Sequence, residues 1–284
     1  MFVILHLIKG GLKVDIAHKR TDREIKKLEK ELDILYKRTS NEITKQLKAK
    51  YKQLQKNDTA EVRKQIKHLE DTLKRITIEQ ENTNKIAMDM LEGELERITD
   101  INSQYTYNFI IDEMARQGIT VTFGAMNTDT LKYIMKGDKY KEQAINRFTS
   151  DKRIIREFKR AMNQSYILGE SEQQAMRRIR KIIDMELYES KRIVRTENTK
   201  AQSLARDASI RDAINLGIKT KKEWRSCGDS RVRPTHQRLN GEIVEYDKEF
   251  SNGCTFPAID GPASEVVMCR CTFVPVLEGF GFDE

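Results

Sequence analysis

The sequence of 284 residues has little proline, few aromatic residues and no long apolar run. It contains four prolines and 7% aromatic residues, and its mean hydropathy is −0.67. Because proline breaks helix interiors, its scarcity favours long helices. A membrane-spanning helix needs about 18 consecutive apolar residues, and the sequence offers no such stretch. A soluble, helix-rich chain is therefore expected.

The chain opens with the short apolar stretch MFVILHLI. No basic segment precedes this stretch and no clear small-residue cleavage site follows it, so it does not have the pattern of a signal peptide. It is expected to form a short strand or a docking segment.

Cysteine is also scarce, and its four positions all lie in the last quarter of the chain. Disulfide frameworks are typical of short secreted proteins. Since no export signal is recognised, we expect synthesis in a reducing cytoplasm, in which clustered cysteines are thiols or metal ligands. The four residues are Cys227, Cys254, Cys269 and Cys271.

Charge is abundant and is biased toward the basic side. The chain has a formal net charge of +8, and residues 147–181 hold ten basic and four acidic residues. Such a surface suits phosphate contacts, but no base-reading motif or aromatic ladder accompanies it, so sequence-independent binding of double-stranded DNA is expected. A solvated face, or a surface for an acidic protein, is the alternative. The candidate DNA-binding residues are Arg153, Arg156, Lys159, Arg160, Arg177, Arg178 and Lys181.

Residues 21 to about 100 follow a helical pattern. Apolar residues recur at steps of three and four from Ile25 to Leu54, and a second stripe runs from Val62 to Ile76. A turn near residue 58 separates the two stripes. The pattern predicts two antiparallel helices, as a hairpin or a coiled coil, whose stripe binds a partner or a second copy.

The rest of the chain divides by composition. Residues 101–135 resemble a helix end followed by a compact region, and residues 140–218 return to helix, with a stop and a new N-cap around Gly169 to Ser171 and an end at Gly217. After residue 219 come the prolines and short β-prone runs. The predicted class is α+β, mostly α. Three segments are predicted. Residues 1–115 form an extended helical region for partner binding, residues 116–149 form a compact connecting region, and residues 150–284 form a domain with a small β-containing module.

A distinctive order of residues occupies the last segment. An Arg195-Thr196-Glu197 triplet in a helix precedes a W-x4-D-x-R-x-R-x2-H-x2-L-x-G run, and the sequence CRC follows at residues 269–271. The singled-out residues of the run are Trp224, Asp229, Arg231, Arg233, His236 and Gly241. This order resembles the Mu F-like head morphogenesis proteins, the phage minor head protein family, over roughly residues 150–276. Cys227 and Cys254 are additions to that pattern.

The resemblance implies a low-copy structural protein of a tailed phage, not an enzyme. It implies a place inside the capsid near the portal protein, a role in head assembly and in packaging or ejection of DNA, and presence in the host cytoplasm during assembly. Double-stranded DNA is then an expected partner, and a scaffold or major capsid protein and self-association through the N-terminal helices are further options. No membrane contact is expected in the mature head.

The C-terminal cysteines leave several interpretations open. Cys227, His236, Cys269 and Cys271 make a candidate tetrahedral zinc site, with Asp229 as a substitute for Cys227. Without a metal, Cys269 and Cys271 would be two buried thiols on one side of a strand. A disulfide between them is the least favoured, because its geometry is demanding. The cofactor is thus either none or structural zinc.

Two rival functions also remain open. His236, with the arginines, Asp229 and Glu197, suits a phosphodiesterase or nuclease, and Cys269 with His236 suits a thiol nucleophile pair. A cytoplasmic coiled-coil adaptor would explain residues 21–100, but it gives the C-terminal residues no role.

Overall fold

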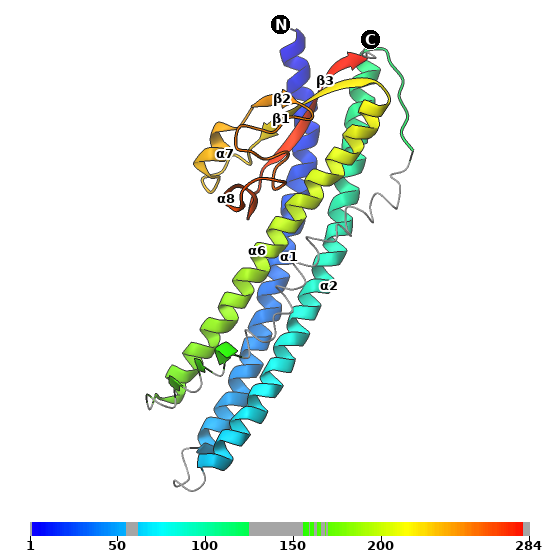
Figure 1. Ribbon diagram of the computed structural model, residues 1–284. Helices are drawn as coiled ribbons and strands as arrows, with labels where there is room; N and C mark the ends of the chain where they lie inside the picture. Colours follow the sequence, from blue (N-terminus) through cyan, green and yellow to red (C-terminus); the bar gives the residue numbers. More distant parts are fainter. Residues whose placement is uncertain are drawn as a thin grey trace. The chain divides into compact units, whose positions relative to one another are not determined.

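Figure 1 shows the computed structural model, which describes residues 2–54, 62–124, 156–158, 160–161, 164–165, 168 and 170–280. Three long helices dominate these residues: α1 (Phe2–Leu54), α2 (Val62–Arg116) and α6 (Glu172–Asn215). The small elements that follow are β1 (Ile218–Arg225), α7 (Pro234–Arg238), β2 (Ile243–Glu245), α8 (Ala263–Val266) and β3 (Thr272–Phe280). The predicted class, α+β and mostly α, is confirmed.

The start of the chain corrects one expectation. The MFVILHLI stretch was expected to be a short strand or a docking segment. The strand is wrong, because helix α1 begins at Phe2 and runs without a break to Leu54, and the docking role stays a prediction. The stretch continues directly into a long series of strong helix formers, and a helix extends at little cost once it is nucleated. The two glycines at positions 10 and 11 reduce helix propensity without ending the helix.

The chain folds into two compact units that are interleaved in sequence. One unit comprises residues 1–27, 92–138 and 192–284, and the second comprises 28–91 and 139–191. The helices α1, α2 and α6 each cross a boundary between the two units, so each helix contributes residues to both. The three consecutive segments predicted from the sequence, and the roles assigned to them, stay predictions.

In the second unit, the predicted apolar stripe is used inside the chain. Leu32 and Ile43 of α1 are 0% exposed, as is Ala87 of α2. Tyr36, rather than Leu35, continues the stripe, and its hydroxyl donates to Asn84 Oδ1 at 2.9 Å. These α1 side chains therefore pack within the chain, and binding of the portal protein or of a second copy by the N-terminal helices stays a prediction.

Helix α6 begins and ends with the signals seen in the sequence. The Ser171 hydroxyl accepts from the backbone N–H of Gln174, and the Ser171 N–H donates to the Gln174 side chain at 2.8 Å. This reciprocal pair satisfies N–H groups that a helix start leaves free. Past the other end, Gly217 has φ 89°, a left-handed value that suits glycine at a helix C-terminus. The predicted cap and stop are confirmed.

The first unit carries a three-stranded antiparallel sheet in the order β2-β1-β3. These strands confirm the three β-prone runs. The predicted Asn240-Gly241 turn lies just before β2, with Gly241 at φ 88°. Because β1 is the central strand, Trp224 near its end is enclosed and 0% exposed, as predicted for a core anchor.

Two apolar clusters hold this unit. One gathers side chains of α2, α6, β1 and β3 around Phe256 and Phe273, whose rings stack at 4.7 Å. The second, here called the Trp224 cluster, consists of Trp224, Leu239, Phe250, Cys254, Ala258, Cys269 and Cys271. Both CRC cysteines are thus core residues of the small module.

No helix among the described residues has both the length and the apolar character that crossing a bilayer requires.

A buried lysine lies between the two clusters. Lys222 of β1 is 0% exposed, and its Nζ donates to the Thr255 carbonyl at 2.8 Å. The ammonium lies 4.3 Å from the ring centre of Phe256 and 5.3 Å from that of Phe250. Burial lowers the pKa of Lys222 to about 8, although the rings favour its charged form.

This lowered pKa predicts a pH dependence of stability. Between about pH 8 and 10.5 the unfolded lysine keeps a proton that the folded one has lost, so the contribution of Lys222 to stability rises with pH across that window. The difference in unfolding free energy between wild type and Lys222→Met, from chemical denaturation at each pH, should rise accordingly. Lys219→Met replaces an exposed lysine of the same strand. The difference in unfolding free energy between wild type and this control variant should not change with pH across the window. Parallel curves for wild type and Lys222→Met would contradict the assignment.

Candidate functional site: the seam between helix α6 and the C-terminal chain

One face of α6 is polar and yet buried. Five side chains at helical spacing share this face, and each is at most 7% exposed. We call them the α6 polar face: Thr196, Thr199, Gln202, Ser203 and Arg206. Burying polar groups is costly unless each is hydrogen-bonded, so the partners of these residues determine what the face does.

The first two residues bind the chain around CRC. Thr196 Oγ1 accepts from the Met268 N–H at 3.0 Å while donating to its own helix. The Thr199 hydroxyl lies 2.8 Å from the Cys269 carbonyl oxygen, to which it donates. Met268 has φ 59°, a left-handed value that is uncommon for a residue with a side chain. The threonines thus hold a tightly turned stretch of backbone.

The next two residues hold other parts of the module. The Gln202 side-chain amide donates to Thr272 Oγ1 at 2.8 Å, at the start of β3. The Ser203 hydroxyl donates to the Pro257 carbonyl at 2.7 Å. Side chains of one helix therefore bind two separate segments of the C-terminal chain.

Arg206 completes the face and is 1% exposed. Its Nε donates to Asn102 Oδ1 of α2 at 3.0 Å, and its Nη1 donates to the Phe273 carbonyl of β3 at 2.8 Å. The planar guanidinium has donors on several sides, which suits a junction of three elements. It links α2, α6 and β3.

The three residues of the Arg-Thr-Glu triplet bind different partners. The sequence suggested that its Arg and Glu tie the helix to the β module, which stays a prediction, and Thr196 makes one bond to that module. Arg195 donates to Asp22 of α1 at 2.6 Å, and Glu197 pairs with Lys200 one turn along. Threonine reaches the module because it lies on the same face as the other seam residues.

The W-x4-D-x-R-x-R run forms a second set of bonds around CRC. Asp229 accepts two hydrogen bonds from Arg270, the central residue of CRC, both at 2.5 Å. These bonds are the chief reason that the pKa of Asp229 is far below its usual value. Arg231 also donates to Asp229, whereas Arg233 donates to the backbone carbonyls of residues 265 and 267. The run therefore binds the backbone just before CRC and the side chain of its central residue.

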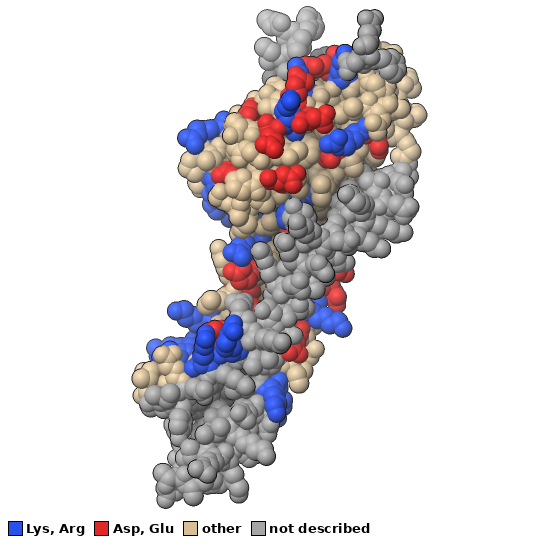
Figure 2. Space-filling model, in the orientation of Figure 1, with Lys and Arg blue, Asp and Glu red and all other residues tan. Residues whose placement is uncertain are grey.

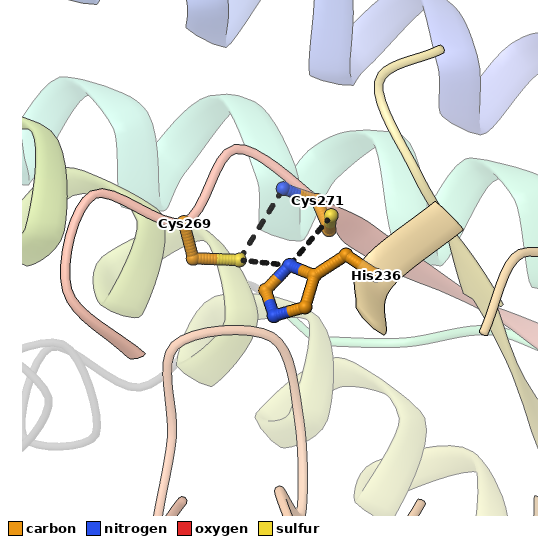
Figure 3. A group of neighbouring side chains, drawn as sticks. All are labelled: His236, Cys269 and Cys271. Carbon is orange, nitrogen blue, oxygen red and sulfur yellow. Dashed lines mark hydrogen bonds between the residues drawn. The ribbon is translucent and has the colours of Figure 1, made fainter. Parts of the chain in front are cut away.

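Figure 3 shows His236 of α7 between the two CRC cysteines. Its Nδ1 lies 3.3 Å from Cys271 Sγ and 3.7 Å from Cys269 Sγ. The three ligand atoms lie within 4.8 Å of one another. All three residues are at most 2% exposed, and the Trp224 ring lies edge-on to His236 at 5.2 Å.

The pKa values of the two thiols shift in opposite directions. The hydrogen bond from Cys269 is the main reason that the pKa of Cys271 falls, to about 5, and the same bond raises the pKa of Cys269. His236 adds to the lowering at Cys271. The backbone N–H of Cys271 also points to Cys269 Sγ, at 3.4 Å. The site therefore favours a thiolate beside the imidazole.

The other two cysteines lie apart from this group. Cys227 is half-buried and its sulfur is not among the clustered ligand atoms, although the sequence had grouped it with them. Cys254 is 0% exposed in the Trp224 cluster, and burial raises the pKa of its thiol to about 11. The structure brings together His236, Cys269 and Cys271 of the four predicted ligands.

The predicted DNA-binding residues are only partly described. Arg156, Arg160, Arg177 and Lys181 are exposed, and Arg153 and Lys159 lie outside the described residues. Arg160 pairs with Glu157 at 3.0 Å. Arg178 donates to Glu170 through both Nε and Nη2, and these bonds lower the pKa of Glu170 to about 2. Figure 2 shows basic side chains interspersed with acidic ones on the visible face.

Several site residues were missed from the sequence. Gln202, Ser203 and Arg206 continue the spacing of Thr196 and Thr199, so a search for a second, polar stripe on α6 would have found them. Arg270 lies inside the CRC motif, but the motif was interpreted through its two cysteines alone. Glu265 carries no local signal, since only the fold brings it 2.9 Å from His236.

Comparison with known proteins identifies the segment that contains this seam. Residues 156–274 match the family Phage Mu protein F like protein. This part of the chain is Mu F-like. The match agrees with the resemblance drawn from the triplet, the run and CRC, and confirms it.

Two curated relatives share part of the chain. Minor head protein GP7 of Bacillus phage SPP1 is 28% identical over 130 residues, 44% of this chain and 42% of that protein. The NAD(+)--arginine ADP-ribosyltransferase EFV of Enterococcus faecalis is 36% identical over 114 residues, 39% of this chain and 23% of that protein. The chain thus covers less than half of either relative. No solved structure matches it.

The family match and the similarity to GP7 both link part of this chain to phage minor head proteins.

The seam predicts a specific cost for losing one hydroxyl. Thr199→Val keeps the shape of the side chain but leaves the buried Cys269 carbonyl without its partner, which should lower the unfolding free energy by about 1–3 kcal/mol. Chemical denaturation of the full chain measures this change. Thr99→Val is the matched control, because the buried Thr99 hydroxyl donates to the Leu95 carbonyl of its own helix. Equal losses in both variants would contradict the role of the seam.

Proposed function

We propose that the chain is a minor head protein that sits inside the capsid, bound to the portal protein, and takes part in head assembly and in packaging or ejection of DNA. The observation that carries the proposal is the seam itself. Residues that mark the Mu F-like segment make contacts that join a long helix to a small module, and such contacts are typical of a structural role.

The same geometry disfavours the catalytic alternatives. His236, Cys269 and Cys271 are at most 2% exposed, so a phosphodiester or peptide substrate has no route to them without unfolding of the cluster. The arginines that a nuclease would aim at phosphate have partners within the module: Arg231 donates to Asp229, and Arg233 donates to a backbone carbonyl. A catalytic acid–base group must reach its substrate, and the burial of His236 argues against that role.

The similarity to the ADP-ribosyltransferase fits the same proposal. It covers 23% of that protein, so the shared stretch accounts for a minority of its length. We attribute this stretch to a structural module that both proteins contain, and we do not carry the transferase activity over to this chain.

A partner surface for DNA is best sought on the exposed side of α6. Arg177, Arg180 and Lys181 lie within one helical turn of each other, and all three are exposed. Each phosphate that such residues neutralise releases counterions and makes binding weaker in salt. Arg178 is a poorer candidate, because Glu170 already compensates its charge.

The head role predicts where the protein is found. Purified virions of the phage that encodes the chain should contain it at a few copies per particle, measured by quantitative mass spectrometry against the portal and major capsid proteins. Tail removal should not release it. Its absence from finished particles, with normal amounts in infected cells, would contradict residence in the head.

Binding of the full chain to random-sequence duplex DNA, titrated at several salt concentrations, tests the DNA surface. Replacing Arg177 and Lys181 together by Gln should weaken binding and reduce the slope of log affinity against log salt by about 2, if each makes one phosphate contact. Arg178→Gln should change that slope little, because its charge is paired. A wild-type chain that shows no affinity at low salt would remove DNA from the proposal without affecting the head role.

A further inference from the structure

The His236, Cys269 and Cys271 group has the donor set and geometry of a metal site. For tetrahedral zinc with ordinary bond lengths, a nitrogen and a sulfur ligand lie about 3.6 Å apart. The two distances from His236 Nδ1 to sulfur are 3.3 and 3.7 Å. The side chains are therefore already arranged around a position that a zinc ion fits.

The imidazole is oriented from its far side. His236 Nε2 lies 2.9 Å from Glu265 Oε2, within ion-pair distance although not aligned as a hydrogen bond. A carboxylate there favours a proton on Nε2, which leaves Nδ1, facing the sulfurs, as the free ligand atom. Carboxylates commonly orient metal-bound histidines in this way.

Glu265 is itself held in place. The Thr235 hydroxyl and the Asn252 side-chain amide donate to it, at 3.1 and 3.3 Å. These two bonds fix the carboxylate beside the histidine.

Charge balance also suits a divalent ion. Two thiolates and a neutral imidazole carry a net charge of −2, so a bound divalent cation makes the buried group neutral. A pair of thiolates with imidazole selects zinc over magnesium or calcium, which prefer oxygen ligands. On binding, zinc replaces the thiol protons, which pass to solvent.

We propose that His236 Nδ1, Cys269 Sγ and Cys271 Sγ bind one structural zinc ion, with Glu265 as the positioning residue for His236. Cys227 is not part of this group, so the fourth corner of the tetrahedron falls to water or another small donor. The ion joins α7 to the chain that enters β3. It therefore fixes the same CRC segment that the α6 polar face binds. The proposal does not depend on the head role.

The wild-type full chain provides the first test. After zinc loading, reduction and desalting, elemental mass spectrometry should find about one zinc per chain, and X-ray absorption at the zinc edge should show two sulfur neighbours. Cobalt(II) in place of zinc should give a thiolate-to-cobalt charge-transfer band. A chain that retains no zinc, or a site with no sulfur neighbours, would overturn the proposal.

Variants then test which residues bind. Cys269→Ser, Cys271→Ser and His236→Asn should each lose most of the bound metal and the cobalt band. Cys254→Ser is the matched control, because that thiol is equally buried in the same cluster but lies outside the ligand group. Full zinc in Cys271→Ser, or its loss in Cys254→Ser, would contradict the ligand set. If the variants do not fold, the wild-type absorption data decide alone.

Glu265→Gln tests the positioning role. It keeps an acceptor near His236 but removes the charge, so the zinc dissociation constant should rise about 10-fold. The cobalt band should stay in place, because the ligands are unchanged. An unaltered dissociation constant would show that Glu265 does not position the histidine.

Discussion

The small module depends on hydrogen bonds between side chains of α6 and the backbone of the C-terminal chain. Thr196, Thr199 and Arg206 bind a backbone N–H or carbonyl that lies in irregular chain or in a strand. Irregular backbone buried against a helix needs such partners, because an unpaired buried N–H or carbonyl is costly. The polar face of the helix thus supplies hydrogen-bond partners for the backbone of a turn-rich module that is buried against it.

This arrangement explains why the marker residues are scattered along the sequence. The Arg-Thr-Glu helix, the run after Trp224 and the CRC motif lie in separate elements, yet they meet along one seam. Asp229, in the loop after β1, binds Arg270 of CRC, and Thr196 and Thr199 hold the adjacent backbone from α6. A polar seam demands matched partners, which a purely apolar contact does not, and so it specifies one geometry.

Much of the fold could be predicted from the sequence. The steps of three and four from Ile25 onward predicted two long helices, which α1 and α2 confirm, whereas the turn expected near residue 58 lies outside the described residues. The Ser171 cap, the stop at Gly217 and the Asn240-Gly241 turn were predicted at the right positions, because each is a local signal. Residue Glu265 shows the limit: its approach to His236 depends on how two short helices are placed. The use of the α1 stripe inside the chain was missed for a similar reason, since an apolar stripe does not say which surface will cover it.

Amide hydrogen exchange of the full chain, followed by mass spectrometry, tests the central claim about the seam most directly. In a chain carrying both Thr196→Val and Thr199→Val, the amides of residues 266–276 should exchange faster than in wild type. Those of residues 28–43, which belong to the second unit, should be unchanged. Unaltered exchange over residues 266–276, or equal acceleration in both segments, would contradict the view that the α6 polar face holds the C-terminal chain.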